Sequence, residues 1–131
     1  MPMHVIVCSS NPAVVGAVSR PFDQHGHRLT VCESSLEVLG AASVVAADLV
    51  ILDLETPGLG GLLLISALQE RAPGMPLVAV STRPDPDARL LSQRGVAYAM
   101  LSSAPADAAH PLLAALAAGA GSGLSFRAEA R

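Results

Sequence analysis

The sequence predicts one α/β domain in which five strands alternate with five helices and the strands form a parallel sheet. Short apolar runs of strand length recur along the chain, and helical patterns separate them, as in repeated β–α units. The runs are apolar throughout instead of alternating with polar residues, which is typical of strands covered on both faces. The chain has 131 residues, which is enough to bury a core of its own.

The first part of the chain contains two predicted strands and one helix. The run HVIVC predicts a strand at His4–Cys8, and RLTVC predicts another at Arg28–Cys32. Between them Asn11 is a good N-cap and Pro12 suits the first helical position, so a helix is expected from Pro12 toward Gln24. Pro21 lies inside this helix and is expected to kink it or end it early.

The alternation continues to residue 118. Further strands are expected at Asp48–Asp53, Leu77–Ser81 and Val96–Leu101, and further helices at 34–45, 62–71, 85–94 and 107–118. Thr56–Gly61 is rich in Pro and Gly and is expected to form a loop. We therefore expect one domain over residues 1–118. Residues 119–131 are rich in Gly and Ser and are expected to form a flexible C-terminal tail or a linker stub.

Composition excludes several classes of function. The hydrophobic fraction is 51%, yet no apolar stretch approaches the ~20 residues that cross a bilayer, and the opening MPMHVIVCSS lacks the basic segment of a secretion signal. We expect a cytoplasmic protein without a membrane partner. The net charge is −3 and basic residues do not cluster, which argues against nucleic acid as a partner.

The cysteines and histidines do not form a catalytic or metal-binding pattern. Cys8 and Cys32 both lie in predicted strands, and we expect two reduced, buried thiols. His4, His25 and His27 are expected near one rim of the sheet, but no Cys or carboxylate completes a metal site there. No histidine is expected near a nucleophile, and GxxxxGK[ST] and GxGxxG are both absent. These observations predict a protein that is not an enzyme.

Polar side chains follow the predicted strands at one edge of the sheet. They are Ser9 and Ser10, Asp53, Ser81 and Ser102. In an open parallel sheet, ligands bind beyond the carboxyl ends of the strands, so these side chains are the candidate site.

Three segments that carry these residues resemble one family. DLVILDLETPGLGG (48–61), PLVAVST (76–82) and RGVAYAMLSS (94–103) resemble the response-regulator receiver domains of bacterial two-component signalling, and the resemblance covers about residues 3–118. It implies a flavodoxin-like, doubly wound (βα)5 sandwich, similar to the chemotaxis receivers, with strand order 2-1-3-4-5. It also implies that Asp53 is the phosphoacceptor position and Ser81 the switch hydroxyl.

The chain departs from the family at the positions that support phosphorylation. The acidic pair of the family falls on Ser9 and Ser10, its lysine on Ser102, and the following proline on Ser103. Mg²⁺ requires carboxylates that two hydroxyls do not replace, so Mg²⁺ binding is expected to be weak or absent and no cofactor is expected. Loss of the lysine removes the cation that would neutralise a phosphoryl group.

Two structural expectations follow from the same comparison. Ser9 and Ser10 can either satisfy backbone groups or donate hydrogen bonds to the carboxylate of Asp53. The switch aromatic of the family falls on Ala99, so Tyr98 is expected to point to the other face of the strand.

We favour an atypical receiver that acts mainly as a phosphorylation-independent protein-interaction module. One alternative is a weak phosphoacceptor that receives phosphoryl from a histidine kinase at Asp53. The other alternative is a small flavodoxin-like domain that binds a nucleotide or metabolite at the same rim.

The last predicted strand suggests where a partner binds. Residues 95–106 carry no charge, so both faces of the strand are apolar. One face packs on the core, and the other is covered either by the neighbouring helices or by a partner. We therefore hypothesise that the fourth helix, fifth strand and fifth helix bind a histidine kinase, another signalling protein or a second copy of the chain. Lysine at Ala97 or Ala99 would probe this surface.

Overall fold

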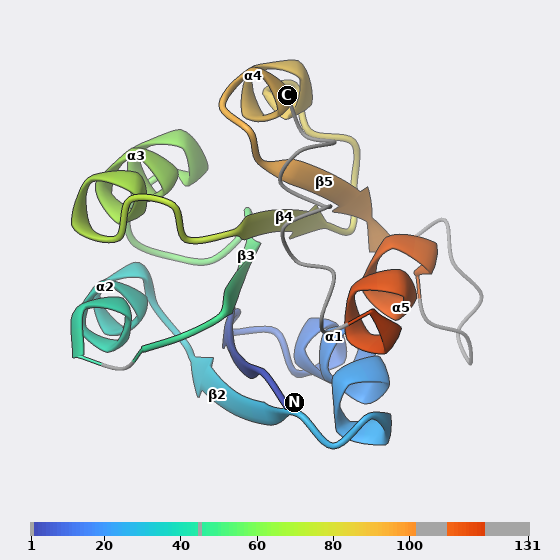
Figure 1. Cartoon of the computed structure of the whole chain (residues 1–131). Helices are drawn as coiled ribbons and strands as arrows, with labels where there is room; N and C mark the ends of the chain where they lie inside the picture. The colour runs from blue at the N-terminus through green and yellow to red at the C-terminus, as the bar shows by residue number, and fades with distance from the viewer. Residues whose placement is uncertain (1, 45, 102–109, 120–131) are drawn as a thin grey trace.

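The computed structural model describes residues 2–44, 46–101 and 110–119. Five parallel strands form one sheet in the order β2-β1-β3-β4-β5 (Figure 1). The strands are β1 (His4–Cys8), β2 (Arg28–Cys32), β3 (Leu49–Asp53), β4 (Leu77–Ser81) and β5 (Ala97–Met100). The helices are α1 (Pro12–Gln24), α2 (Ser35–Val44), α3 (Gly61–Arg71), α4 (Ala88–Gln93) and α5 (Pro111–Ala118). The predicted fold class and strand order are confirmed.

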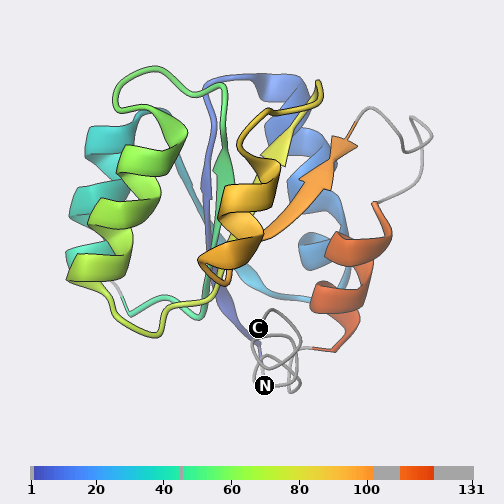
Figure 2. The same cartoon turned by 90° about the horizontal axis from the view of Figure 1, so that it is seen from above.

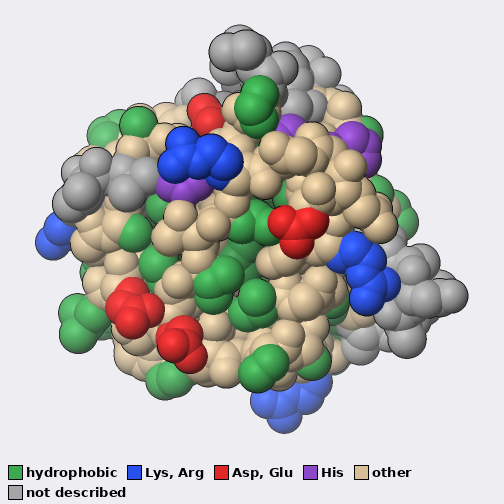
Figure 3. Space-filling view, turned by 90° about the horizontal axis from the view of Figure 1, so that it is seen from below, with side chains coloured by type: hydrophobic (Ala, Val, Ile, Leu, Met, Phe, Trp, Pro, Cys, Tyr) green, Lys and Arg blue, Asp and Glu red, His purple; other side chains and the backbone are tan. Residues whose placement is uncertain are grey.

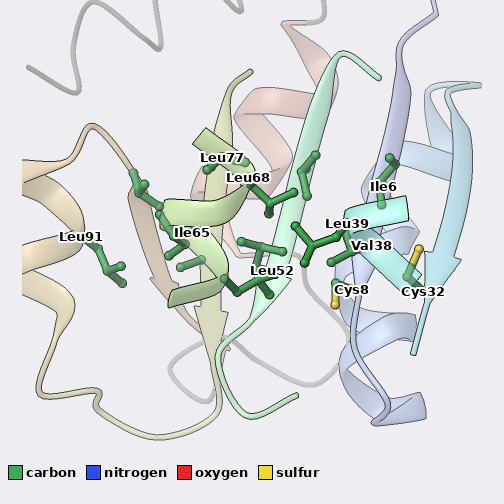
Figure 4. Close-up of a cluster of buried hydrophobic side chains, with 14 residues drawn as sticks. Ile6, Cys8, Cys32, Val38, Leu39, Leu52, Ile65, Leu68, Leu77 and Leu91 are labelled. Atoms are coloured by element: carbon green, nitrogen blue, oxygen red, sulfur yellow. The ribbon is translucent and has the colours of Figure 1, made fainter. Parts of the chain in front are cut away.

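The sheet is the middle of three layers. Helices α2, α3 and α4 cover one face, and α1 and α5 cover the other (Figures 1 and 2). One buried cluster, which includes Ile6, Leu52 and Ile65, fills the space between the sheet and the first group of helices (Figure 4). A second cluster, which includes Phe22 and Leu113, lies on the opposite face. The central strands are buried on both faces, as their continuous apolar sequences predict.

The structure contradicts the early end of α1 that Pro21 suggested and the expected start of α4 at Asp85. Pro21 does not end α1, which continues to Gln24; Pro21 and Phe22 are both buried, so their packing offsets the missing backbone hydrogen bond. α4 begins at Ala88 rather than at Asp85, because the Asp85 side chain accepts a hydrogen bond from the backbone N–H of Asp87 at 2.8 Å. This local turn competes with helix formation. The predicted first turn of the last helix, from residue 107, lies outside the described residues.

β5 is an edge strand whose two apolar faces are covered by different helices. Ala99 is buried with Leu113 and Ala117 of α5, whereas Tyr98 packs on the other face with the cluster that includes Leu91 of α4. Ala99 therefore belongs to the core, and the expectation that it would serve as a surface probe is wrong. No helix in the described part of the chain is long and apolar enough to cross a membrane.

His27 joins three elements at the rim opposite the candidate site. The backbone N–H of Met3 donates to His27 Nδ1 at 2.9 Å, and His27 Nε2 lies 2.8 Å from the carbonyl oxygen of Ala117. Because an amide N–H only donates and a carbonyl only accepts, His27 is the neutral tautomer with its proton on Nε2. The side chain thus ties β1 and β2 to the end of α5. Among the described residues, no group of three or more His, Cys, Asp or Glu side chains is placed to hold a metal ion.

Candidate functional site

Three of the predicted site residues meet at the carboxyl edge of the sheet. Ser9 follows β1 directly, Asp53 ends β3 and Ser81 ends β4. All three are almost fully buried, with exposed fractions of 1%, 4% and 1%. Ser10 is solvent-exposed, and Ser102 and Ser103 lie outside the described residues. The structure therefore brings together one hydroxyl from β1, one carboxylate from β3 and one hydroxyl from β4.

Both carboxylate oxygens of Asp53 accept hydrogen bonds from the protein. Ser9 Oγ donates to Asp53 Oδ2 at 2.7 Å, and the backbone N–H of Glu55 donates to Oδ1 at 2.9 Å. The Ser9 oxygen in turn accepts from the backbone N–H of Asn11 at 3.1 Å. A hydroxyl bound to a carboxylate is a strong, charge-assisted hydrogen bond. Of the two serines considered as donors to Asp53, Ser9 makes the contact, while Ser10 lies exposed.

Ser81 forms a second polar cluster with Tyr98, which lies on the face of β5 opposite Ala99, as predicted. Ser81 Oγ lies 2.5 Å from Tyr98 Oη and 2.5 Å from the carbonyl oxygen of Arg83. Tyr98 reaches Ser81 because Tyr98 pairs in register with Ala79, and residues 79 and 81 point to the same face. The alternation of side chains along a strand shows which residues share a face. It does not show which residues of β4 lie beside Tyr98, because that depends on the register between the two strands.

Glu55 links the two loops that flank the site. Its carboxylate accepts a hydrogen bond from Thr82 Oγ1 at 3.1 Å and pairs with Arg83 Nε at 3.3 Å. The side chain of Arg83 is 80% exposed, so this ion pair is worth little stability. Glu55 is exposed, and it turns toward the end of β4 and not toward Asp53. All eight basic side chains of the sequence are arginines, so the chain offers no lysine at any position.

The loop after Asp53 is held in place by contacts to α2 and β1. Gly58 has φ +115°, and a Cβ there would overlap Ser35 Oγ, so the close approach of this loop to α2 requires glycine. The backbone N–H of Leu59 donates to Ser35 Oγ at 2.9 Å. Thr56 Oγ1 donates to the carbonyl oxygen of Cys8 at 3.3 Å. The loop is therefore fixed at both ends by contacts within the protein.

The two cysteines lie beneath this site. Cys8 and Cys32 are buried, free and paired in register on β1 and β2. Burial raises the pKa of the Cys8 thiol from 9.0 to about 12, with a further contribution from the neighbouring Cys32. Burial also raises the pKa of Cys32. Because the reactive species is the thiolate, both residues are inert thiols rather than nucleophiles.

The chain forms a five-stranded parallel sheet, and a buried carboxylate lies at the end of its central strand. It is therefore an α/β domain with its site at the carboxyl edge of the sheet. The family model of the response regulator receiver domain matches residues 5–102. The chain belongs to this family.

Curated relatives and solved structures agree with this assignment. The chain is 28% identical over 96 residues to the transcriptional regulatory protein GlrR of Escherichia coli K12, covering 72% of this chain and 22% of GlrR. It is 32% identical over 84 residues to the transcriptional activator protein PfeR of Pseudomonas aeruginosa, covering 63% of this chain and 28% of PfeR. The chain thus spans about a quarter of the length of these relatives.

Similar structures share the fold at low sequence identity. A signal receiver domain of an HD domain-containing protein from Pseudomonas fluorescens Pf-5 gives a TM-score of 0.76 at 16% identity, covering 95% of this chain and 99% of that one. A CheY-like receiver domain protein from Methanospirillum hungatei JF-1 gives 0.75 at 15% identity and covers 98% of both chains.

The residues of this site do not fit the Mg²⁺ ion that the family resemblance implies. Mg²⁺ requires near-octahedral oxygen ligands and is drawn in by carboxylate charge. Asp53 is the carboxylate at this edge, and both of its oxygens are already bonded to the protein. Ser9 supplies a hydroxyl in place of a charge, and its oxygen is bonded to Asp53 and Asn11.

Proposed function

We propose that this chain is an atypical receiver domain of two-component signal transduction that acts mainly as a phosphorylation-independent protein-interaction module. In this role it signals through binding and not through catalysis, it works in the cytoplasm, and it needs no Mg²⁺. Because the chain spans only part of its relatives, the output of any longer protein is a separate question.

The observation that carries this proposal is the hydrogen bond from Ser9 Oγ to Asp53 Oδ2 at 2.7 Å. It gives the carboxylate at the phosphoacceptor position a permanent partner. A phosphoryl group at Asp53 would meet hydroxyls at the two acidic-pair positions, Ser9 and Ser10, and a serine at the lysine position, Ser102. Phosphoryl transfer is accelerated almost entirely by positioning and charge stabilisation, and these substitutions remove the charges.

Incubation with acetyl phosphate and Mg²⁺, followed by intact-mass measurement, tests this proposal. We expect no phosphoryl adduct on the native chain. The matched control is the triple variant Ser9→Asp, Ser10→Asp and Ser102→Lys, which restores the family's charges and should acquire an adduct. An adduct on the native chain that Asp53→Asn abolishes would overturn the proposal.

That overturning result would support the weak phosphoacceptor alternative. One observation favours keeping this alternative: Asp53 itself is retained at the end of β3, with Ser81 at the end of the adjacent strand. A Burkholderia pseudomallei response regulator with a TM-score of 0.69, 19% identity and coverage of 97% of this chain and 72% of that one was solved with a phosphorylated aspartic acid and a calcium ion. The ligand-binding alternative has no comparable support.

We place the partner surface of this module on α4, β5 and α5, for a histidine kinase, another signalling protein or a second copy. Leu90 of α4 is 45% exposed, so it offers an apolar contact on this side. Light scattering over a concentration series, with Leu90→Glu as the probe, tests the homodimer form. A monomer at every concentration would remove that form.

A further inference from the structure

Histidine rings bind both ends of the last helix, α5. At its start, the backbone N–H of Leu112 donates to Nδ1 of the N-cap residue His110 at 3.1 Å. At its end, the carbonyl oxygen of Ala117 accepts a hydrogen bond from His27 Nε2 at 2.8 Å. The helix has the sequence PLLAALAA, so it has no polar side chain of its own to hold its ends. We call His27 and His110 the α5 histidines.

Both α5 histidines accept a hydrogen bond at Nδ1, which requires a neutral ring. The donor to His110 is the backbone N–H of Leu112, and the donor to His27 is the backbone N–H of Met3 at 2.9 Å. A ring nitrogen accepts only while it carries no proton. Met3 is itself held in place, because its carbonyl oxygen accepts the N–H of Arg28 at 2.9 Å. Protonation of either ring would therefore set an N–H group against another N–H group.

The other two of the four histidines make hydrogen bonds that survive protonation. His4 Nε2 lies 2.7 Å from Thr30 Oγ1, and a hydroxyl can either donate or accept. His25 Nδ1 lies 2.9 Å from the carbonyl oxygen of Pro21, which only accepts, so this nitrogen already carries a proton. Acid therefore acts selectively on the two bonds that the α5 histidines accept.

The groups packed around His27 do not favour a charged ring. His27 is buried, and from α1 it faces the rings of Phe22 and His25, with ring centres 5.9 Å and 6.3 Å away. β2 adds Arg28, the next residue in the chain, while β1 and α5 contribute the backbone groups already named. Seen from below, histidine side chains gather toward one end of the molecule, and a basic side chain lies against one of them (Figure 3).

Carboxylates among the described residues are not paired with the α5 histidines either. Asp48 accepts the backbone N–H of His4 at 2.9 Å, and Asp23 in the last turn of α1 is exposed. The salt bridge in the described part of the chain joins Glu55 to an arginine. His110 lies at the amino end of α5, where the helix dipole disfavours a positive charge. Protonation there would remove the cap and add a cation at the positive end of the helix.

We propose that α5 is held on the sheet by a pH-sensitive pair of neutral histidines and is released when both rings take up protons. A solvated imidazole is protonated below about pH 6.5, so the contacts are complete above that pH and weaken as the pH falls below it. Release uncovers Leu113 and Ala117, which are buried against the sheet. α5 is part of the proposed partner surface, so acid would also dismantle that surface. This last consequence rests on the proposed function, whereas the release itself does not.

Amide hydrogen exchange of the full chain near pH 7.5 and near pH 5.5 tests this inference. Protection factors remove the intrinsic effect of pH on exchange, and they are compared between the amides of α5 and those of α3. One pH unit below its midpoint, a solvated imidazole is charged about ten times more often than it is neutral. We therefore expect each α5 histidine to lower the protection of α5 about tenfold at the lower pH, while α3 stays protected.

Variants that keep the hydrogen bonds but do not titrate separate this effect from general acid sensitivity. His110→Asn keeps an N-cap acceptor, and His27→Gln keeps one donor and one acceptor. The double variant should show the same protection of α5 at both pH values. His25→Gln is the matched control, because the bond of His25 survives protonation, and it should lose protection of α5 as the native chain does.

Equal protection of α5 in the native chain at both pH values would overturn the inference, and so would the native loss of protection in a folded double variant. The ring ¹⁵N shifts of the native chain keep the inference testable if the double variant does not fold. They should show an unprotonated Nδ1 in His27 and His110 near pH 7.5. Charged rings in both residues while α5 stays protected would overturn it. The acetyl phosphate experiment involves neither histidine, so the two proposals fail separately.

Discussion

Replacing Ser9 by alanine removes the hydroxyl that binds Asp53, and the structure gives the expected loss of stability. The lost bond is a buried, charge-assisted one of 2.7 Å, and such bonds contribute about 1.5–3 kcal/mol. The backbone N–H of Asn11 loses its acceptor as well, which adds about 0.5–1 kcal/mol near the solvent-exposed start of α1. We expect Ser9→Ala to lower the free energy of unfolding by about 2–4 kcal/mol. For a chain of this length that corresponds to a fall of about 10 °C in Tm.

Urea unfolding followed by circular dichroism measures this loss, and Ser10→Ala is the matched control. Ser10 is exposed, so its replacement should change the free energy of unfolding by less than about 0.5 kcal/mol. A double-mutant cycle with Asp53→Asn isolates the coupling between Ser9 and the carboxylate. Equal stability of Ser9→Ala and Ser10→Ala would refute the reasoning, because it would mean that the hydrogen bond from the Ser9 hydroxyl to Asp53 does not stabilise the fold.

Three further predictions concern the partner, the thiols and the opposite rim. In a pull-down from the native cell, Asp53→Asn should bind the same main partner as the native chain. Loss of that partner in the variant would favour the phosphoacceptor alternative. Burial raises the pKa of Cys8 from 9.0 to about 12, so its contribution to stability is complete below pH 9 and is lost between pH 9 and about 12. Urea midpoints should therefore fall more steeply with pH above 9 in the native chain than in Cys8→Ala; equal slopes would contradict this. His27→Ala removes two hydrogen bonds and should lower the free energy of unfolding by about 2 kcal/mol in urea titrations, and a loss no larger than that of the exposed His25→Ala would count against the role of His27.

The sequence predicted the elements whose residues carry strong local signals. β1, β2 and β4 have the predicted bounds; β1 and β4 are buried, largely apolar runs that end at or directly before a serine. The positions of Ser9 and Asp53 at one edge follow from the same runs, since the ends of parallel strands meet.

The missed features depend on contacts between segments that are distant in sequence. The contact between Tyr98 and Ser81 was not predicted, because it depends on the register of β5 against β4. The helix α1 was expected to end early at Pro21, but it continues to Gln24. Pro21 and Phe22 are buried by packing against other elements, which the local sequence does not show.

The most direct test of the central claim, that Ser9 takes the place of a metal ligand at Asp53, is a Mg²⁺ titration followed by amide chemical shifts. The native chain should show no saturable shifts localised to residues 9, 10 and 53 in the low millimolar range. The double variant Ser9→Asp and Ser10→Asp should show them, because it restores the carboxylates that Mg²⁺ requires. Saturation of the native chain at these residues in that range would contradict the account.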